Sequence, residues 1–175
     1  MGEQMKDIVQ QAEQKAEEIR QGYGADDVPV FSYALLMGTY AAVFAGLYRF
    51  ATKNGRKLEQ PRGGELALLA VASYKLSRIV TMSFIGSPLR AAFAERGPSL
   101  KGGEVQDKAR GRGLQRAVGN LVTCPFCFSV WSTTFFVFGY SIARRVTLQA
   151  STILSIAAVD DFLNLGFRNL REQSR

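Results

Sequence analysis

Long apolar runs without a charge alternate with short charged segments along the chain. Residues 28–48 form one such run, and residues 117–143 form a second. A third run, residues 146–167, contains two acidic residues and no basic ones. As a helix, each run is about 30 Å long or longer, which matches the hydrocarbon core of a bilayer. The pattern predicts membrane-spanning helices at about residues 28–48, 121–143 and 146–167.

Residues 66–87 predict a further membrane segment whose orientation the pattern leaves open. The segment is apolar at both ends and contains Lys75 and Arg78 in between. A charge at the centre of a spanning helix costs about 2.5–3.5 kcal/mol, so two charges nearly cancel the apolar gain. The segment either spans, with both charges facing partner helices, or lies along the interface with both side chains reaching water.

Residues 1–27 have the pattern of a short amphipathic helix followed by a glycine hinge, because apolar residues recur at helical spacing among Glu, Gln and Lys. No basic start leads into an apolar run, which argues against a signal peptide. We therefore expect an all-α polytopic membrane protein with three or four transmembrane helices. Its membrane domain covers residues 28–170, with a basic loop at 88–120, and residues 171–175 form a basic tail.

The basic residues are unevenly distributed. Twenty-two Lys and Arg oppose fifteen Asp and Glu, and the segment 86–120 holds the largest share of the basic residues. Lys and Arg favour the cytoplasmic side of a membrane. Arrangements with three and with four spans both place this loop and the C-terminus in the cytoplasm of a bacterial inner membrane, and they differ over the N-terminus. The loop has no interleaved aromatics for base stacking, so we expect contact with anionic lipid headgroups and no nucleic acid.

The chain contains no histidine and only two cysteines. The lack of histidine excludes Ser-His-Asp and Cys-His catalysis and histidine-ligated zinc. Two cysteines cannot supply the four thiolates of an iron–sulfur cluster within one chain. We expect no cofactor and no metal.

Both cysteines lie in the sequence Thr-Cys-Pro-Phe-Cys, which begins at Thr123. Thr123 is expected to cap a helix that has Pro125 in its first turn. Cys124, Cys127 and Trp131 then share one face. Three interpretations remain open: a redox dithiol, a zinc site shared between two chains, and close packing of small side chains. The reducing cytoplasm favours packing.

Four ionisable residues fall within the predicted membrane segments: Lys75, Arg78, Asp160 and Asp161. Ionisable residues inside a membrane usually pair or mark a pathway. Similar depths predict a pair between Arg78 and Asp160, and a structural pair is favoured over a proton or ion path. A third option is that the acids reach water from the end of their helix.

The first predicted span carries small residues at every fourth position, which lets helix backbones approach closely. This predicted packing face consists of Ala34, Gly38, Ala42 and Gly46.

Two stretches carry a resemblance to a known family. One runs from Tyr74 to Thr81 and continues with Pro88-Leu89-Arg90 and Phe93; the other is Leu-Val-Thr-Cys-Pro-Phe-Cys with Trp131. Over about residues 64–165 the chain resembles an uncharacterised family of small bacterial membrane proteins, domain of unknown function thirteen-sixty. The resemblance implies a link of some members to sporulation and brings no assigned activity.

These observations favour a non-enzymatic function: a structural or interaction scaffold in a bacterial membrane, assembled as a homo-oligomer or with a protein partner. The alternative from another class is a membrane thiol-disulfide oxidoreductase that uses Cys124 and Cys127. A second alternative is an ion or proton conduit through Arg78 and Asp160.

Overall fold

The computed structural model describes residues 11, 14, 30–55, 57–100 and 102–173. The predicted amphipathic helix at residues 1–27 lies outside the described residues, apart from Gln11 and Gln14, which are helical and exposed.

The described chain is mostly helical, as predicted. Its helices, in order, are α2 (Val30–Ala51), the short 3₁₀ helix η1 (Lys53–Gly55), α3 (Gly64–Met82), the 3₁₀ helix η2 (Phe84–Gly86), α4 (Ser87–Arg90), α5 (Gly113–Thr123) and α6 (Pro125–Gln173). The backbone of Ala143 is not helical (φ −141°, ψ 62°), and this kink divides α6 into a first arm, residues 125–142, and a second arm, residues 144–173.

Two of these helices, α2 and α6, are long and apolar enough to cross a membrane. They overlap the spans predicted at residues 28–48, 121–143 and 146–167, and the kink lies beside the arginine pair that separates the last two. α3 occupies most of residues 66–87, the segment whose orientation the sequence left open. It ends at Met82, because Ser83 has an extended backbone. The helix predicted from residue 121 begins at Pro125, because residues 121–123 complete α5.

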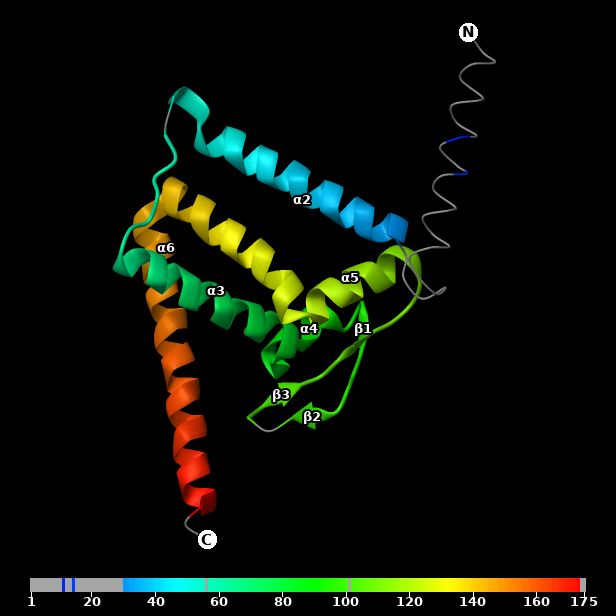
Figure 1. Cartoon of the computed structure of the whole chain (residues 1–175), viewed down its shortest axis with the longest axis vertical. Coiled ribbons are helices and arrows are strands. Elements are labelled where there is room, and N and C mark those ends of the chain that lie inside the picture. The colour runs from blue at the N-terminus through cyan, green and yellow to red at the C-terminus, as the bar shows by residue number, and fades with distance from the viewer. Residues whose placement is uncertain (1–10, 12–13, 15–29, 56, 101, 174–175) are drawn as a thin grey trace.

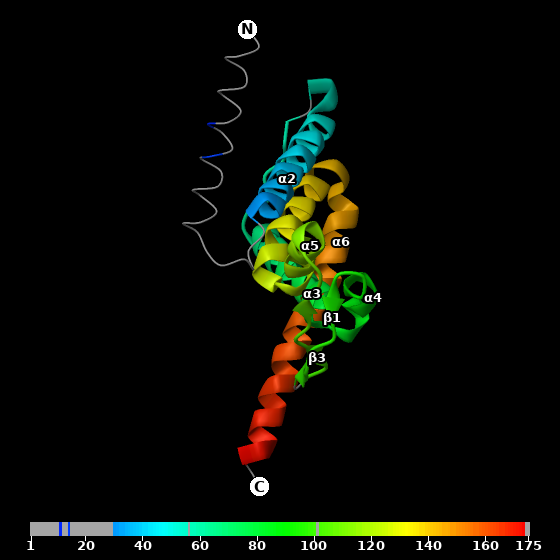
Figure 2. The ribbon, with the colours of Figure 1, turned by 90° about the vertical axis from the view of Figure 1, so that its right-hand side faces the viewer.

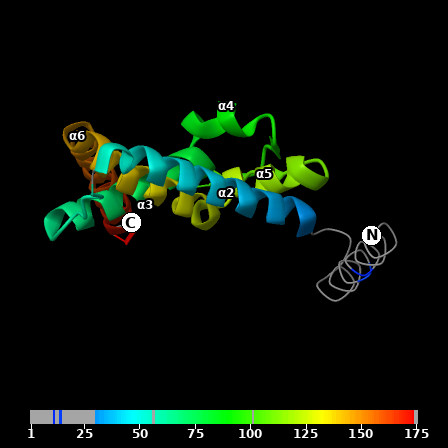
Figure 3. The same ribbon diagram turned by 90° about the horizontal axis from the view of Figure 1, so that it is seen from above.

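The first arm of α6 lies between α2 and α3, and the three run side by side (Figure 1). The start of α2, the end of α3 and the start of α6 lie at one end, together with α4 and α5 (Figures 1 and 3). The second arm of α6 crosses α3 and extends past the other helices (Figures 1 and 2).

Small polar side chains fill the contacts between the helices. Ser73 of α3 shares hydrogen bonds with Ser132 (2.7 Å) and Thr133 (2.8 Å) of the first arm. Ser155 of the second arm donates to the Leu68 carbonyl (2.9 Å). Small residues and hydroxyl groups between helices are typical of membrane proteins, where lipid provides no hydrophobic force for packing.

Large apolar side chains point outward instead. Phe31 is 82% exposed and Phe126 is 86% exposed, and many Leu, Ile and Phe residues of α6 resemble them. A buried cluster of apolar residues exists between α3 and α6, formed by Leu69, Ala72, Phe136 and Tyr140. Most of the large apolar surface nevertheless faces the surroundings, which is the reverse of a water-soluble protein.

The loop between α4 and α5 is ordered by four two-residue strands, which the sequence analysis did not predict. β1 (Ala94–Glu95) pairs antiparallel with β4 (Lys108–Ala109), and β2 (Ser99–Leu100) pairs antiparallel with β3 (Glu104–Val105). Strands of two residues are too short to show alternating polarity, which is the pattern that identifies a strand in a sequence. The expectation of an all-α fold is therefore corrected to a mostly helical one.

Candidate functional site

Cys124 connects α5 to α6 and caps the second of these helices. Its backbone is extended (φ −106°, ψ 109°), and its Sγ accepts a hydrogen bond from the Cys127 backbone N–H (3.2 Å). The cap predicted at Thr123 is wrong, because Thr123 is the last residue of α5 and its hydroxyl donates back to the Gly119 carbonyl (2.9 Å). The cap lies one residue further along, and a thiol takes the place of the hydroxyl.

Both cysteines line an apolar cavity of about 610 Å³ between α2, α5 and the start of α6. Trp131, Tyr40 and Met37 line the same cavity. Trp131 packs edge-on against Tyr40, with ring centroids 5.2 Å apart. The lining residues include no carboxylate and no basic side chain. The cavity can therefore hold two adjacent thiols against aromatic rings, and it offers no charged group to accept a thiol proton.

We expect Cys124→Ala to lower the free energy of unfolding by about 1 kcal/mol, because the first turn of α6 loses its cap. Cys124→Ser should cost less, because a hydroxyl oxygen can accept the same hydrogen bond. Thermal unfolding in mild detergent measures both values. Equal losses from the two variants would show that the cap does not stabilise α6.

Arg78 pairs with the loop and not with α6. Its guanidinium forms an ion pair with Glu104 of β3, in which Nε donates to Oε1 at 3.0 Å, and Nη1 donates to the Tyr74 hydroxyl (3.2 Å). The predicted Arg78–Asp160 pair is wrong, and Asp160 accepts a hydrogen bond from Asn164 instead (3.3 Å). The reason is that the folded loop brings Glu104 beneath the end of α3, whereas a flexible loop would not.

Lys75 and Asp161 form the ion pair that joins α3 to the second arm of α6. The Lys75 side chain is only 13% exposed, so the pair neutralises a charge that is largely withdrawn from the surroundings. The four ionisable residues therefore include one cross-helix pair, but it joins Lys75, one turn before Arg78, to Asp161, the residue after Asp160. Consecutive residues point about 100° apart on a helix, so matched depth alone cannot select the partner.

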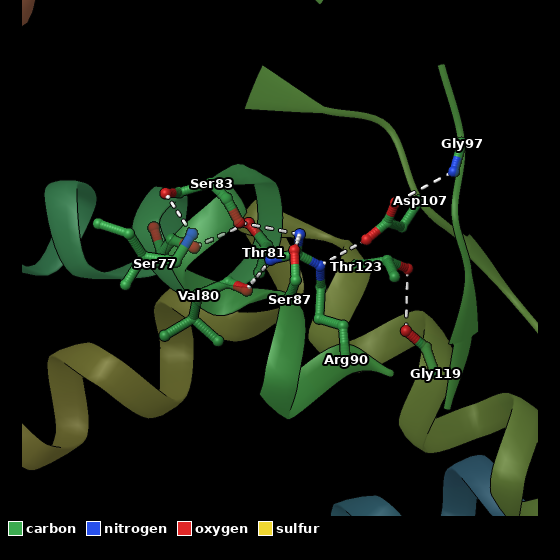
Figure 4. Close-up of polar contacts among 11 residues, drawn as sticks. Ser77, Val80, Thr81, Ser83, Ser87, Arg90, Gly97, Asp107, Gly119 and Thr123 are labelled. Carbon is green, nitrogen blue, oxygen red and sulfur yellow. Dashed lines mark hydrogen bonds and ion pairs between the residues drawn. The ribbon is translucent and has the colours of Figure 1, made fainter. Parts of the chain in front are cut away.

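Arg90 is the buried charge that sequence reasoning missed. Its Nε donates to Asp107 (2.8 Å), Nη1 to the Val80 carbonyl (2.6 Å) and Nη2 to the Ser83 carbonyl (2.9 Å). Asp107 in turn accepts from the Gly97 backbone N–H (3.1 Å) (Figure 4). One guanidinium thus closes the end of α3 and anchors the loop. The sequence signal for this residue is the Pro88-Leu89-Arg90 step of the family motif, which does not by itself indicate a buried guanidinium.

A second polar cluster closes the opposite end of the bundle. Glu65, in the first turn of α3, accepts a hydrogen bond from the Tyr140 hydroxyl (2.6 Å) and pairs with Arg144 beside the kink. The hydrogen bond from Tyr140, followed by that from Arg144, holds the pKa of the Glu65 carboxyl below its usual value. The Arg144 Nε also donates to the Tyr140 hydroxyl (2.9 Å). This cluster ties the start of α3 to the turn between the two arms.

The predicted packing face of α2 does not contact the rest of the described chain closely. Ala34, Gly38, Ala42 and Gly46 are all exposed, and a Cβ added at either glycine would meet nothing within 4 Å. The inward face of α2 carries larger residues, including Tyr40, whose hydroxyl bonds to Thr134 (2.7 Å). Contact through the small-residue face therefore remains a prediction about a second molecule.

Comparison with known proteins gives two matches. A family described as "Protein of unknown function (DUF1360)" matches residues 68–167. The Sporulation protein YjcA of Bacillus subtilis (strain 168) is 25% identical over 100 residues, which cover 55% of this chain and 85% of that protein. No solved structure matches. The family match extends from α3 into the second arm of α6 and leaves α2 outside.

Proposed function

The chain belongs to the family of proteins of unknown function DUF1360, and from this premise we propose that it is a non-enzymatic scaffold of a bacterial inner membrane. The observation that carries the proposal is the inverted packing, with small hydroxyl side chains between the helices and large apolar side chains outside. The name of the relative connects that protein with sporulation, and we propose that this chain also acts in sporulation.

Four spans are the arrangement that we propose for the membrane domain. α3 lies alongside the first arm of α6 (Figure 1), and its Lys75 and Arg78 both have acidic partners, which lowers the cost of inserting it. The second arm, residues 144–173, is about 45 Å long and can span with a tilt. The N-terminus, the basic loop and the C-terminus are then cytoplasmic, where the loop meets anionic lipid headgroups.

The ion pairs support a structural function over the conduit. Lys75, Arg78 and Arg90 each pair with an acid from another segment of the chain, so each pair holds two parts of the fold together. A conduit would need ionisable groups that follow one another along a path, and Arg78 and Asp160 were the residues assigned to it. Arg78 pairs with Glu104 and Asp160 bonds to Asn164, so the two residues do not form a continuous path.

The open face of α2 supports assembly with a second copy. Gly38→Leu and Gly46→Leu should each shift the protein in mild detergent from an oligomer towards a monomer, because the added side chains prevent close approach of helix backbones. Size-exclusion chromatography with light scattering measures the shift. Leu36→Phe, on a different face of α2 and beside the cavity that Cys124 lines, is the control. A monomeric wild type, or equal effects from all three variants, would contradict the proposed assembly.

The thiol-disulfide oxidoreductase remains the second candidate, because Cys124 and Cys127 line one cavity with Trp131. The scaffold proposal expects both cysteines as free thiols in growing cells, since the proposed topology places the helix start at the reducing side. Acid-quenched alkylation followed by mass spectrometry reads out the redox state. A substantial oxidised fraction would put the oxidoreductase first.

A further inference from the structure

A crevice of about 960 Å³ opens between the second half of α3, the turn at residues 102–104 and the second arm of α6. Its volume is near the upper end of the range for small-molecule sites, roughly 300–1,000 Å³. Five charged side chains line it: Lys75, Arg78, Glu104, Asp161 and Arg168.

Four of these charges neutralise one another in pairs. Glu104 is occupied by Arg78, and Asp161 is occupied by Lys75. Arg168 lines the same crevice and makes no hydrogen bond or ion pair with any residue that the structure describes. The guanidinium of Arg168 is therefore the one positive charge in the crevice that has no acidic partner among the described residues. A guanidinium offers paired N–H donors whose geometry matches the oxygens of a phosphate.

An apolar wall lies beside this charge. Ile79, Phe162 and Leu165 line the crevice together with Arg168, so the same space offers both an anion-binding group and an apolar surface. A free phosphate would leave that wall in contact with water. A phosphodiester that carries acyl chains would cover it.

The crevice also lies at the depth of lipid headgroups. Arg78 is four residues before the end of α3 at Met82, which corresponds to about 6 Å along the helix. The headgroup layer on each side of a bilayer is about 5–7 Å thick. With α3 ending at the cytoplasmic side, the crevice covers the boundary between headgroups and acyl chains.

We propose that this crevice binds the phosphodiester headgroup of an anionic phospholipid from the inner leaflet. Arg168 contacts the phosphate, and the acyl chains lie against Phe162 and Leu165. The inference rests on the proposed membrane location, and it adds a defined lipid site to the general contact of the basic loop with the membrane.

The test uses the full chain in nanodiscs of phosphatidylcholine with a minor fraction of phosphatidylglycerol. After transfer to mild detergent, native mass spectrometry counts the phosphatidylglycerol that each chain retains. We expect the wild type to retain a single molecule and Arg168→Gln to lower retention about tenfold, which is the loss of one charge-assisted contact. Arg112→Gln removes an exposed arginine at the start of α5, outside the crevice, and should leave retention unchanged.

Three outcomes would overturn the proposal. Equal losses from the two variants would show non-specific attraction to surface charge. No preference of the wild type for phosphatidylglycerol over phosphatidylcholine would show that the crevice does not select an anion. Displacement of the lipid by millimolar inorganic phosphate would assign the site to free phosphate. A carbonate wash of cell membranes separates these failures from the scaffold proposal, because a chain that stays in the membrane but fails the lipid test refutes the lipid site alone.

Discussion

Arg90→Met should lower the free energy of unfolding by about 3–5 kcal/mol, the largest effect that we expect from a single substitution. The Arg90 side chain is 1% exposed and that of Asp107 is 8% exposed, so removal of the guanidinium leaves a buried carboxylate without its partner. The carbonyls of Val80 and Ser83 also lose their donor. Thermal unfolding of the full chain in mild detergent measures the loss.

Two further variants separate the ion pair from general effects of charge. Arg90→Met combined with Asp107→Leu should recover part of the loss, because the unpaired carboxylate is removed while the two carbonyls remain without a donor. Arg112→Met, at an exposed arginine, should unfold like the wild type. If Arg90→Met were as stable as Arg112→Met, the buried ion pair would not be what holds the loop to α3.

Ser132→Leu should destabilise the contact between α3 and α6 by about 1–3 kcal/mol, because there is no room for the larger side chain. Ser132 is 0% exposed, and its hydroxyl bonds to Ser73 across the contact. The added methyl groups force the two backbones apart and break that bond. Heating of the detergent-solubilised protein, with the folded fraction followed by circular dichroism, measures the change.

Thr152→Leu is the matched control, because it makes a similar change of side chain at an exposed position of the second arm. In a membrane protein this face meets lipid, so the substitution should be tolerated. Should Thr152→Leu destabilise the protein as much as Ser132→Leu, the exposed face of α6 would not be the lipid-facing one.

Features that depend on the sum of many residues could be predicted from the sequence. The apolar runs identified α2 and α6, because the length of an uncharged run is a property of the local sequence alone. The boundary at Ala143 could also be predicted, because Arg144 and Arg145 interrupt the apolar run.

Gly139 helps the two arms of α6 to approach each other, since a Cβ there would lie 3.0 Å from the Thr147 hydroxyl oxygen.

Features that depend on a single distant partner could not be predicted. Arg78 pairs with Glu104, 26 positions away, and only the folded loop brings the two together. Cys124 and not Thr123 caps α6, because the end of α5 decides which residue becomes extended. The small residues of α2 recur at every fourth position, but no pattern in one helix reveals whether its partner lies within the chain.

The central claim is that the chain spans the membrane with its basic loop in the cytoplasm. Labelling of single introduced cysteines tests this claim most directly. In a Cys124→Ser, Cys127→Ser background, single cysteines replace Gln60 between α2 and α3, Ser99 in the loop and Asn169 near the C-terminus. An impermeant maleimide added to intact cells should label Gln60→Cys, and it should reach Ser99→Cys and Asn169→Cys only after lysis. Protection of Gln60→Cys would show that α3 does not span, and labelling of Ser99→Cys in intact cells would contradict the account.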